Sequence, residues 1–261
     1  MQTGDEVALI VGRLRAAGCV FAEDEADLLV REAGTLAGLE RMIGRRVGGE
    51  PLEYILGWVA FRGLRVAVEP GVFVPRRRSE FVVAQALEAG RASESPVVVD
   101  LCCGSGALGR AVAAAWPGAL LAAADIDPVA VRCARLNLAG IGEVYEGDLF
   151  EPVPTQLRGS VTTLVVNAPY VPTEAIALMP PEARLHEARR ALDGGSDGLD
   201  VQRRVAAAAP HWLAPGGHLV IETSRVQAER TEALFREAGL SARIAHSGEF
   251  DATVVIATLT R

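Results

Sequence analysis

The sequence predicts an α/β protein in which a mostly parallel sheet carries helices on both faces, preceded along the chain by a small N-terminal helical domain. Three observations carry this prediction. From about residue 95 onward, short apolar strand-like runs alternate with helix-like segments, as in a parallel sheet. The last two strand-like runs follow each other without a helix, which indicates an antiparallel hairpin at the sheet edge. The first 50 residues instead repeat apolar residues at helical spacing.

The N-terminal segment, residues 1–50, is predicted to form short helices. Apolar residues recur at helical spacing from Val7 to Leu14, and a second run of the same kind follows. The breaker cluster Gly48-Gly49-Glu50-Pro51 is expected to end this domain. Residues 51–78 are then expected to form a β-hairpin linker, because polar and apolar residues alternate there.

Residues 79–261 are predicted to form the main domain. Its first helix is expected to run from Ser79, whose hydroxyl would cap it, to about Ala89. The predicted strands lie within residues 96–101, 119–125, 143–148, 162–167, 217–222 and 252–258. Asp127-Pro128 combines a capping side chain with a proline at the first helical position, so a helix is expected to begin there.

The composition argues against several classes of function. The net charge is −7, every basic residue is an arginine, and the short run Arg76-Arg77-Arg78 is expected to be a solvated turn. Nucleic acid is therefore disfavoured as a partner, because phosphate contacts need clustered cations. The cysteines and histidines lack metal-ligand spacing, so no metal site is expected. No apolar run of about 20 residues and no signal-peptide pattern is present, which leads us to expect a cytoplasmic protein without a membrane span.

A glycine-rich turn follows the first strand of the main domain. Gly104-Ser105-Gly106-Ala107-Leu108-Gly109 matches the pattern G-x-G-x-x-G, and Asp125 ends the next strand. NAD and S-adenosylmethionine both contain an adenosine ribose that a carboxylate at the second position can bind. The two motifs therefore predict a nucleotide-like cofactor without deciding between these two.

Three features favour S-adenosylmethionine over NAD. Asp100 directly precedes the glycine-rich turn, where a carboxylate is unhelpful beside a pyrophosphate but suits a cationic amino acid or a sulfonium. Asp148 follows the third strand, where its side chain could accept a hydrogen bond from an adenine amino group. The closing antiparallel hairpin is foreign to the dinucleotide fold and usual in class I methyltransferases. The sequence therefore predicts methyl transfer by a Rossmann-like, class I methyltransferase domain.

The motif Asn167-Ala168-Pro169-Tyr170 ends the fourth predicted strand. Here the sequence resembles the protein-(glutamine-N5) methyltransferases, which modify glutamine in release factors and ribosomal proteins and carry Asn-Pro-Pro-Tyr at this place. The resemblance covers roughly residues 45–261. Its further segments are residues 49–57, 70–76, 100–106, 147–150, 191–195, 197–200 and 215–217.

The resemblance implies a catalytic role for all four residues of this motif. An amide nitrogen is a poor nucleophile, because its lone pair is delocalised. The side-chain oxygen of Asn167 and the carbonyl of Ala168 would accept hydrogen bonds from its two N–H groups. Pro169 would fix the backbone, and Tyr170 would form an aromatic wall. Catalysis would then rest on positioning and electrostatics.

The resemblance also implies a set of cofactor-binding residues. Phe73, Arg76 and Ser79 match family positions that surround the methionine end of the cofactor. The other residues of the expected cofactor site are Asp100, Cys102, Cys103, Gly104, Ser105, Gly106, Asp125, Ile126, Asp148 and Leu149, together with Asn167.

The chain departs from the family pattern at three places, which suggests a divergent paralogue. Ala168 stands where the family has a proline, Cys102 where it has a glycine, and Arg77-Arg78-Ser79-Glu80 where it has Pro-Glu-Thr-Glu. Three functions stay open. The first is methylation of a protein glutamine, with the N-terminal helices docking the partner. The second is methylation of an amino or amide nitrogen in a small molecule or nucleic acid. The third is cofactor binding without transfer.

Overall fold

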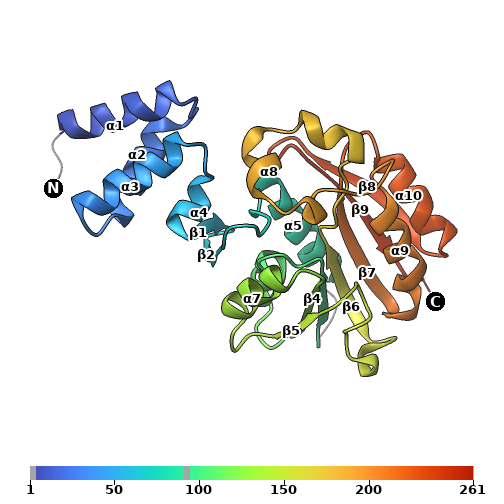
Figure 1. Ribbon diagram of the computed structural model, residues 1–261. Coiled ribbons are helices and arrows are strands. Elements are labelled where there is room, and N and C mark those ends of the chain that lie inside the picture. Colours follow the sequence, from blue (N-terminus) through green and yellow to red (C-terminus); the bar gives the residue numbers. More distant parts are fainter. Residues whose placement is uncertain (1–3, 91–94, 261) are drawn as a thin grey trace.

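The computed structural model describes residues 4–90 and 95–260. An N-terminal group of helices leads through a small two-stranded sheet into a seven-stranded α/β domain (Figure 1). Across the described ranges, none of the helices has both the length and the apolar character that crossing a membrane requires.

The N-terminal helices pack around a core of their own. They are α1 (Gly4–Ala16), α2 (Ala22–Glu32), α3 (Leu36–Val47) and the short α4 (Leu52–Leu56). Leu14, Leu29 and Ile43 are fully buried in this core, and Ile55 of α4 packs into it as well. Tyr54 of α4 packs instead with Val68 and Val74, so α4 contacts the segments on both sides of it. Gly49, at φ +91, turns the chain between α3 and α4. A domain boundary at residue 50 stays a prediction.

A β-hairpin lies within residues 51–78, the segment predicted to be a hairpin linker, and follows the helix α4. Strands β1 (Trp58–Phe61) and β2 (Leu64–Ala67) pair antiparallel. Arg62 and Gly63 join them, both with positive φ, as a tight two-residue hairpin turn requires. The amide of Asn137 fixes this hairpin to the main domain: it binds both the N–H and the carbonyl of Ala67 at 2.8 Å and also donates to the carbonyl of Ser105.

The main sheet has the strand order β5-β4-β3-β6-β7-β9-β8. Its strands are β3 (Val97–Leu101), β4 (Leu120–Asp125), β5 (Glu143–Glu146), β6 (Val161–Val166), β7 (Leu213–Thr223), β8 (Ser241–Ser247) and β9 (Ala252–Thr258). The first five pair parallel, whereas β9 runs antiparallel between β7 and β8. Both the parallel sheet and the closing antiparallel hairpin at its edge are confirmed.

Helices cover both faces of this sheet (Figure 1). The helices of the main domain are α5 (Glu80–Ala89), α6 (Ala107–Ala115), α7 (Pro128–Asn137), α8 (Pro181–His186), α9 (Asp200–Ala208) and α10 (Ala228–Glu237). Val98 and Val220 belong to the core shared with α5, α6 and α7, whereas Val99 and Leu219 belong to the core shared with α9 and α10. Neighbouring residues of one strand thus face opposite layers, which explains why these strands are apolar throughout.

Two helix starts were predicted from capping residues, with different outcomes. Asp127 caps α7 as expected, since its side chain accepts a hydrogen bond from the N–H of Val129 at 2.9 Å. The predicted capping role of Ser79 is wrong. Ser79 closes a 3-10 turn (Arg77–Ser79) and already has helical φ and ψ, so its hydroxyl does not reach back to the helix. It donates to Glu222 Oε2 at 2.6 Å instead.

Candidate active site

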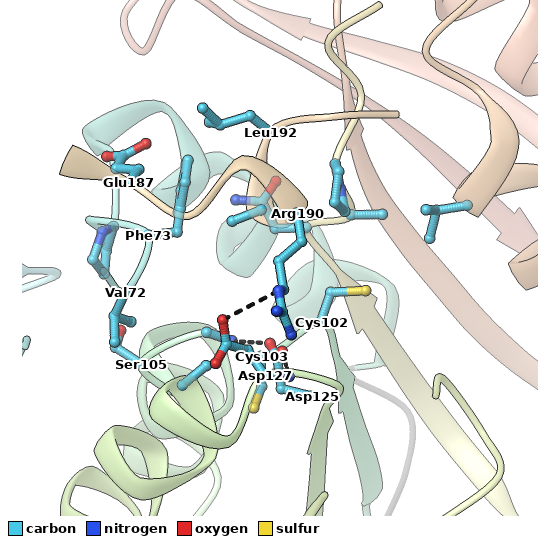
Figure 2. Close-up of a pocket in the computed structure, with 18 of the residues that line it drawn as sticks. Val72, Phe73, Cys102, Cys103, Ser105, Asp125, Asp127, Glu187, Arg190 and Leu192 are labelled. Atoms are coloured by element: carbon cyan, nitrogen blue, oxygen red, sulfur yellow. Dashed lines mark hydrogen bonds and ion pairs between the residues drawn. The ribbon is translucent and has the colours of Figure 1, made fainter. Parts of the chain in front are cut away.

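A cavity opens at the carboxyl ends of the parallel strands (Figure 2). The central strand β3 has β4 on one side and β6 on the other, so the chain reverses its order in the sheet at this point. Such switch points form crevices that bind ligands in open α/β sheets. The turns that follow β3, β4, β5 and β6 all contribute to the cavity wall.

Most of the residues predicted for the site line this single cavity. They are Phe73, Arg76, Ser79, Cys102, Cys103, Gly104, Ser105, Asp125, Ile126, Asp148, Leu149, Asn167, Ala168, Pro169 and Tyr170. The structure therefore brings the expected cofactor residues and the expected acceptor motif together, although they come from five separate stretches of the chain.

Asp100 and Gly106 are the two predicted residues that are not part of the lining. The Asp100 carboxylate is fully buried and accepts a hydrogen bond from the N–H of Gly109 in α6 at 2.8 Å. Asp100 thus supports the glycine-rich turn from behind, and its other oxygen, Oδ1, has no hydrogen-bond partner among the described residues. A contact between Asp100 and the cofactor stays a prediction. Burial raises the pKa of Asp100 to about 7. Gly106 starts α6 at φ +78, where a Cβ atom would come within 3.1 Å of Leu138.

Two carboxylates organise the nucleotide side of the cavity. Asp125 accepts hydrogen bonds from the N–H of Gly104 at 2.8 Å and from the N–H of Asp127 at 2.9 Å. Burial nevertheless raises the pKa of Asp125 above its usual range. Asp148 pairs with Arg204 at 2.6 Å. Figure 2 also shows Arg190 reaching towards Asp127, with 3.6 Å between Arg190 Nε and Asp127 Oδ2.

We call the part of the cavity around Ser105, Asp125 and Asp148 the cofactor half, and its residues fit S-adenosylmethionine. Within residues 4–90 and 95–260, Ser105 Oγ and Glu187 Oε2 are buried polar atoms without a hydrogen-bond partner, and both residues line the cavity. Buried polar groups normally have partners, so two such atoms in residues that line the cavity indicate a polar ligand. Among the described residues, carboxylates and arginines line the cavity in equal number, and Asp148 and Glu187 pair with Arg204 and Arg76, whereas Asp125 binds only backbone N–H groups.

We call the part of the cavity around Ser79, Asn167 and Tyr170 the acceptor half. Its side chains are connected through hydrogen bonds to Glu222. Tyr170 Oη donates to Glu222 Oε1 at 2.9 Å, and Arg78 Nε lies 3.1 Å from the same oxygen. Ser79 donates to the other carboxylate oxygen and lies 3.3 Å from Asn167 Nδ2. Burial and the neighbouring Glu222 carboxylate hold the pKa of Tyr170 well above its usual range, so this side chain is a neutral phenol.

Several site residues were not found from the sequence. Glu222 is the second-last residue of β7, and Asp125 is the last residue of β4, so an acidic residue near the carboxyl end of a parallel strand was a usable signal. Glu187 and Arg190 come from the connection between β6 and α9, which has no periodic pattern that would place them. The expectation that residues 76–78 form a solvated turn holds for Arg77 and Arg78, which are exposed in a 3-10 turn, but two of the three side chains also reach inward: Arg76 pairs with Glu187 and Arg78 with Glu222.

Comparison with known proteins places this site in a family. A family model described as the methyltransferase small domain matches residues 63–198. The release factor glutamine methyltransferase of Geobacter sulfurreducens is 40% identical over 207 residues, covering 78% of this chain and 71% of the relative. That of Deinococcus radiodurans is 35% identical over 265 residues and covers 94% of each chain. The chain belongs to the release factor glutamine methyltransferase family. The predicted family resemblance is thereby confirmed.

Membership in the release factor glutamine methyltransferase family has two direct consequences. The cofactor of the chain is S-adenosylmethionine, and the main domain is a class I methyltransferase domain. One further relative carries a different name: the 4-amino-L-phenylalanine/4-methylamino-L-phenylalanine methyltransferase of Streptomyces pristinaespiralis. It is 36% identical over 203 residues, covering 76% of this chain and 69% of the relative. In the part of the chain that the structure describes, no cluster of His, Cys, Asp or Glu is arranged to hold a metal ion.

Proposed function

We propose that this chain transfers the methyl group of S-adenosylmethionine to the side-chain amide nitrogen of a glutamine in a protein. One observation carries the proposal. Asn167 and Ala168 line the same cavity as the cofactor residues, and no described residue donates a hydrogen bond to Asn167 Oδ1 or to the Ala168 carbonyl. Two acceptor oxygens on adjacent residues match the two N–H groups of a primary amide.

The chemistry follows from what these residues can hold in place. The bound cofactor supplies an electrophilic methyl group on a sulfonium. Asn167 Oδ1 and the Ala168 carbonyl would accept hydrogen bonds from the two amide N–H groups and orient the nitrogen towards that methyl group. The sulfur would leave as the thioether with the bonding electron pair, and the proton that the nitrogen loses would pass to solvent. Both oxygens also stabilise the positive charge that grows on the nitrogen during transfer. The neutral Tyr170 forms one wall of the acceptor site without competing as an anion.

We assign Asp125 to the ribose hydroxyls, Asp148 to the adenine amino group, and Ser105 and Glu187 to the amino-acid end of the cofactor. Asp125 is already fixed by two backbone N–H groups, so it presents its remaining acceptor capacity in a set direction. A buried carboxylate such as Glu187 Oε2 gains most from a cationic partner, because an unpaired buried acceptor is costly.

The protein acceptor we propose is a release factor, the substrate named for the relatives from Geobacter sulfurreducens and Deinococcus radiodurans. The N-terminal helical domain supports docking of a protein, because it exposes the apolar side chains of Leu9, Val20, Phe21 and Leu36. Arg46 in α3 is buried and pairs with Glu25 of the same domain and with Glu182 of α8. A partner bound to the N-terminal helices would therefore be held in a defined position relative to the cavity. A cytoplasmic location stays a prediction.

A small aromatic amine is the second candidate acceptor. One relative at 36% identity is named for methylating 4-amino-L-phenylalanine. Ala168, which stands where the glutamine methyltransferases have proline, is a change in the acceptor half that could accompany such a substrate. An aniline nitrogen also has two N–H groups that the same two oxygens can accept.

The test supplies methyl-labelled S-adenosylmethionine together with either a purified bacterial release factor or 4-amino-L-phenylalanine. We expect label in the release factor, located by mass spectrometry on a glutamine side chain. Asn167→Ala should lower kcat by about 10²–10³-fold, the usual effect of removing one transition-state hydrogen-bond group, while the affinity for S-adenosylhomocysteine changes less than about twofold. Label in the amine alone would replace the first candidate by the second. A cofactor-binding protein that labels neither would contradict the transfer proposal.

A further inference from the structure

Glu222 lies behind the acceptor half and does not line the cavity. It sits near the carboxyl end of β7 and is 1% exposed. Its carboxylate accepts hydrogen bonds from Ser79 Oγ at 2.6 Å, Tyr170 Oη at 2.9 Å and Arg78 Nε at 3.1 Å. Two of the cavity's acceptor-side residues, Ser79 and Tyr170, are therefore bound to a group that cannot itself reach a substrate.

The directions of these hydrogen bonds have a consequence for Asn167. An ionised carboxylate only accepts hydrogen bonds, so the Ser79 hydroxyl must use its single proton to donate a hydrogen bond to Glu222. The Ser79 oxygen can then offer only lone pairs to Asn167. The group of Asn167 that faces Ser79 at 3.3 Å must therefore be the amino group, Nδ2. This leaves Oδ1 as the polar atom available to an acceptor amide.

We propose that Glu222 is a positioning residue for methyl transfer, which acts through Ser79 to set the orientation of the Asn167 amide and binds Tyr170 directly. The inference rests on the proposed function, since it matters which atom of Asn167 meets the acceptor. The two orientations of an asparagine amide have almost the same shape, so packing alone discriminates poorly between them. The wrong orientation would present N–H groups to the N–H groups of the acceptor.

Arg78 supplies the positive charge that pairs with Glu222. A carboxylate with 1% exposure needs an ionic or hydrogen-bonded partner to stay charged. The Arg78 guanidinium supplies a cation at 3.1 Å. This arginine stands where the family pattern has a glutamate, so in this chain the cation on Glu222 comes from a position at which the chain departs from that pattern.

The decisive variant is Glu222→Gln, which keeps the shape and removes the charge. A glutamine can donate to Ser79 Oγ, which frees the Ser79 proton to point at Asn167 and favours the reversed amide. We expect kcat for glutamine methylation to fall by about tenfold to a hundredfold, the scale of a misplaced reacting group. The affinity for S-adenosylmethionine, measured by calorimetry, should change less than about threefold. Ser79→Ala should lower kcat to a similar extent, whereas Ser79→Thr, which keeps the hydroxyl, should retain a kcat close to that of the wild type.

Two controls separate positioning from general damage. Thr231→Val removes a fully buried hydroxyl that binds Thr223, the β7 neighbour of Glu222 that faces the other side of the sheet. It should lower the melting temperature at least as much as Glu222→Gln and leave kcat within about twofold. The double variant Glu222→Gln/Ser79→Ala should have about the same kcat as the slower of the two single variants. The effects do not add, because both substitutions break the same hydrogen bond between Ser79 and Glu222.

The outcomes are distinct from those of the proposed function. A Glu222→Gln enzyme with kcat within about twofold of wild type would overturn the positioning role while glutamine methylation stands. A loss of cofactor affinity as large as the loss of kcat would also overturn it. If the wild-type chain methylates no glutamine, the proposed function fails, and NMR still tests the positioning. The Asn167 side-chain amide protons, identified because their signals vanish in Asn167→Ala, should show contacts to Ser79 in the wild type that disappear in Glu222→Gln. Unchanged contacts would contradict the proposal.

Discussion

The cofactor half and the acceptor half of the cavity are built in different ways. In the cofactor half, short turns follow successive strands. Asp125 is held there by backbone, as where it binds the N–H of Gly104, while Asp148 and Glu187 pair with the side chains of Arg204 and Arg76. In the acceptor half, the contacts join side chains that are far apart in the sequence. Ser79 and Glu222, which share a hydrogen bond of 2.6 Å, are 143 residues apart.

This difference predicts how each half responds to substitution. A turn that presents backbone N–H groups keeps them when a side chain changes, provided that the backbone conformation survives. A network of side chains loses a member with each substitution and leaves buried partners unsatisfied. We therefore expect changes in the cofactor half to act on cofactor affinity and changes in the acceptor half to act on turnover.

Asp125→Asn tests this division with the largest expected effect. Losing a charge-assisted hydrogen bond to the cofactor costs about 1.5–3 kcal/mol, so the Kd for S-adenosylmethionine should rise by about tenfold to a hundredfold. The kcat at saturating cofactor should change less than about threefold, the opposite of the effect expected for Asn167→Ala. Calorimetry and steady-state kinetics measure the two quantities.

A matched control for this substitution is Asp193→Asn. Asp193 also accepts a backbone N–H in a turn, that of Gly195, and a hydroxyl, that of Thr173, but it does not line the cavity. It should leave the cofactor affinity within about twofold. If Asp125→Asn lowered kcat as strongly as it weakened binding, the separation between the two halves would not hold.

The same difference explains what the sequence could predict. The parallel sheet, its closing hairpin and the glycine-rich turn follow from local patterns, because alternating strands and helices leave few possible arrangements. The hydrogen bonds that connect Asn167 to Ser79 and Glu222 could not be predicted from local patterns. The inward direction of Ser79 depends on a 3-10 turn in front of α5, and its partner Glu222 comes from the far end of the domain. The capping role predicted for Ser79 failed because local propensity cannot reveal a tertiary partner.

Asp100 marks a second limit of the sequence, and it yields a prediction on pH. Its position before the turn predicts a contact with the cofactor but did not reveal the hydrogen bond that its carboxylate accepts from the N–H of Gly109. Burial raises its pKa from 3.8 to about 7, so between about pH 4 and 7 the unfolded chain binds fewer protons than the folded one. The free energy of unfolding that Asp100 contributes therefore falls as the pH rises through this window.

Comparison with Asp100→Asn isolates this effect, because the asparagine does not titrate there. The melting temperature of the wild type, relative to that of the variant, should be highest near pH 4 and should decline up to about pH 7. Both proteins share every other titrating group, so a difference that stays constant across this range would show that Asp100 ionises normally in the folded protein.

The smallest expected effect concerns Cys102, where the chain departs from glycine within the cofactor half. Cys102 has φ +54, in the left-handed region that costs a side-chain-bearing residue about 1–2 kcal/mol. Cys102→Gly relieves this strain but makes the unfolded chain more flexible, at a cost of about 0.4–1 kcal/mol. The free energy of unfolding should therefore rise by up to about 1 kcal/mol.

Cys102→Ala is the control, since it removes the thiol and keeps the strained backbone. It should not show the gain in stability on thermal or denaturant unfolding, and a gain equal to that of Cys102→Gly would assign the effect to the thiol instead of to φ. Both variants should bind S-adenosylmethionine within about threefold of the wild type, because the turn acts through its backbone. Since Cys102 lines the cavity as directly as Asn167 does, tolerance at the first position and intolerance at the second would show that the construction of each half, and not nearness to the ligand, decides the effect of a substitution.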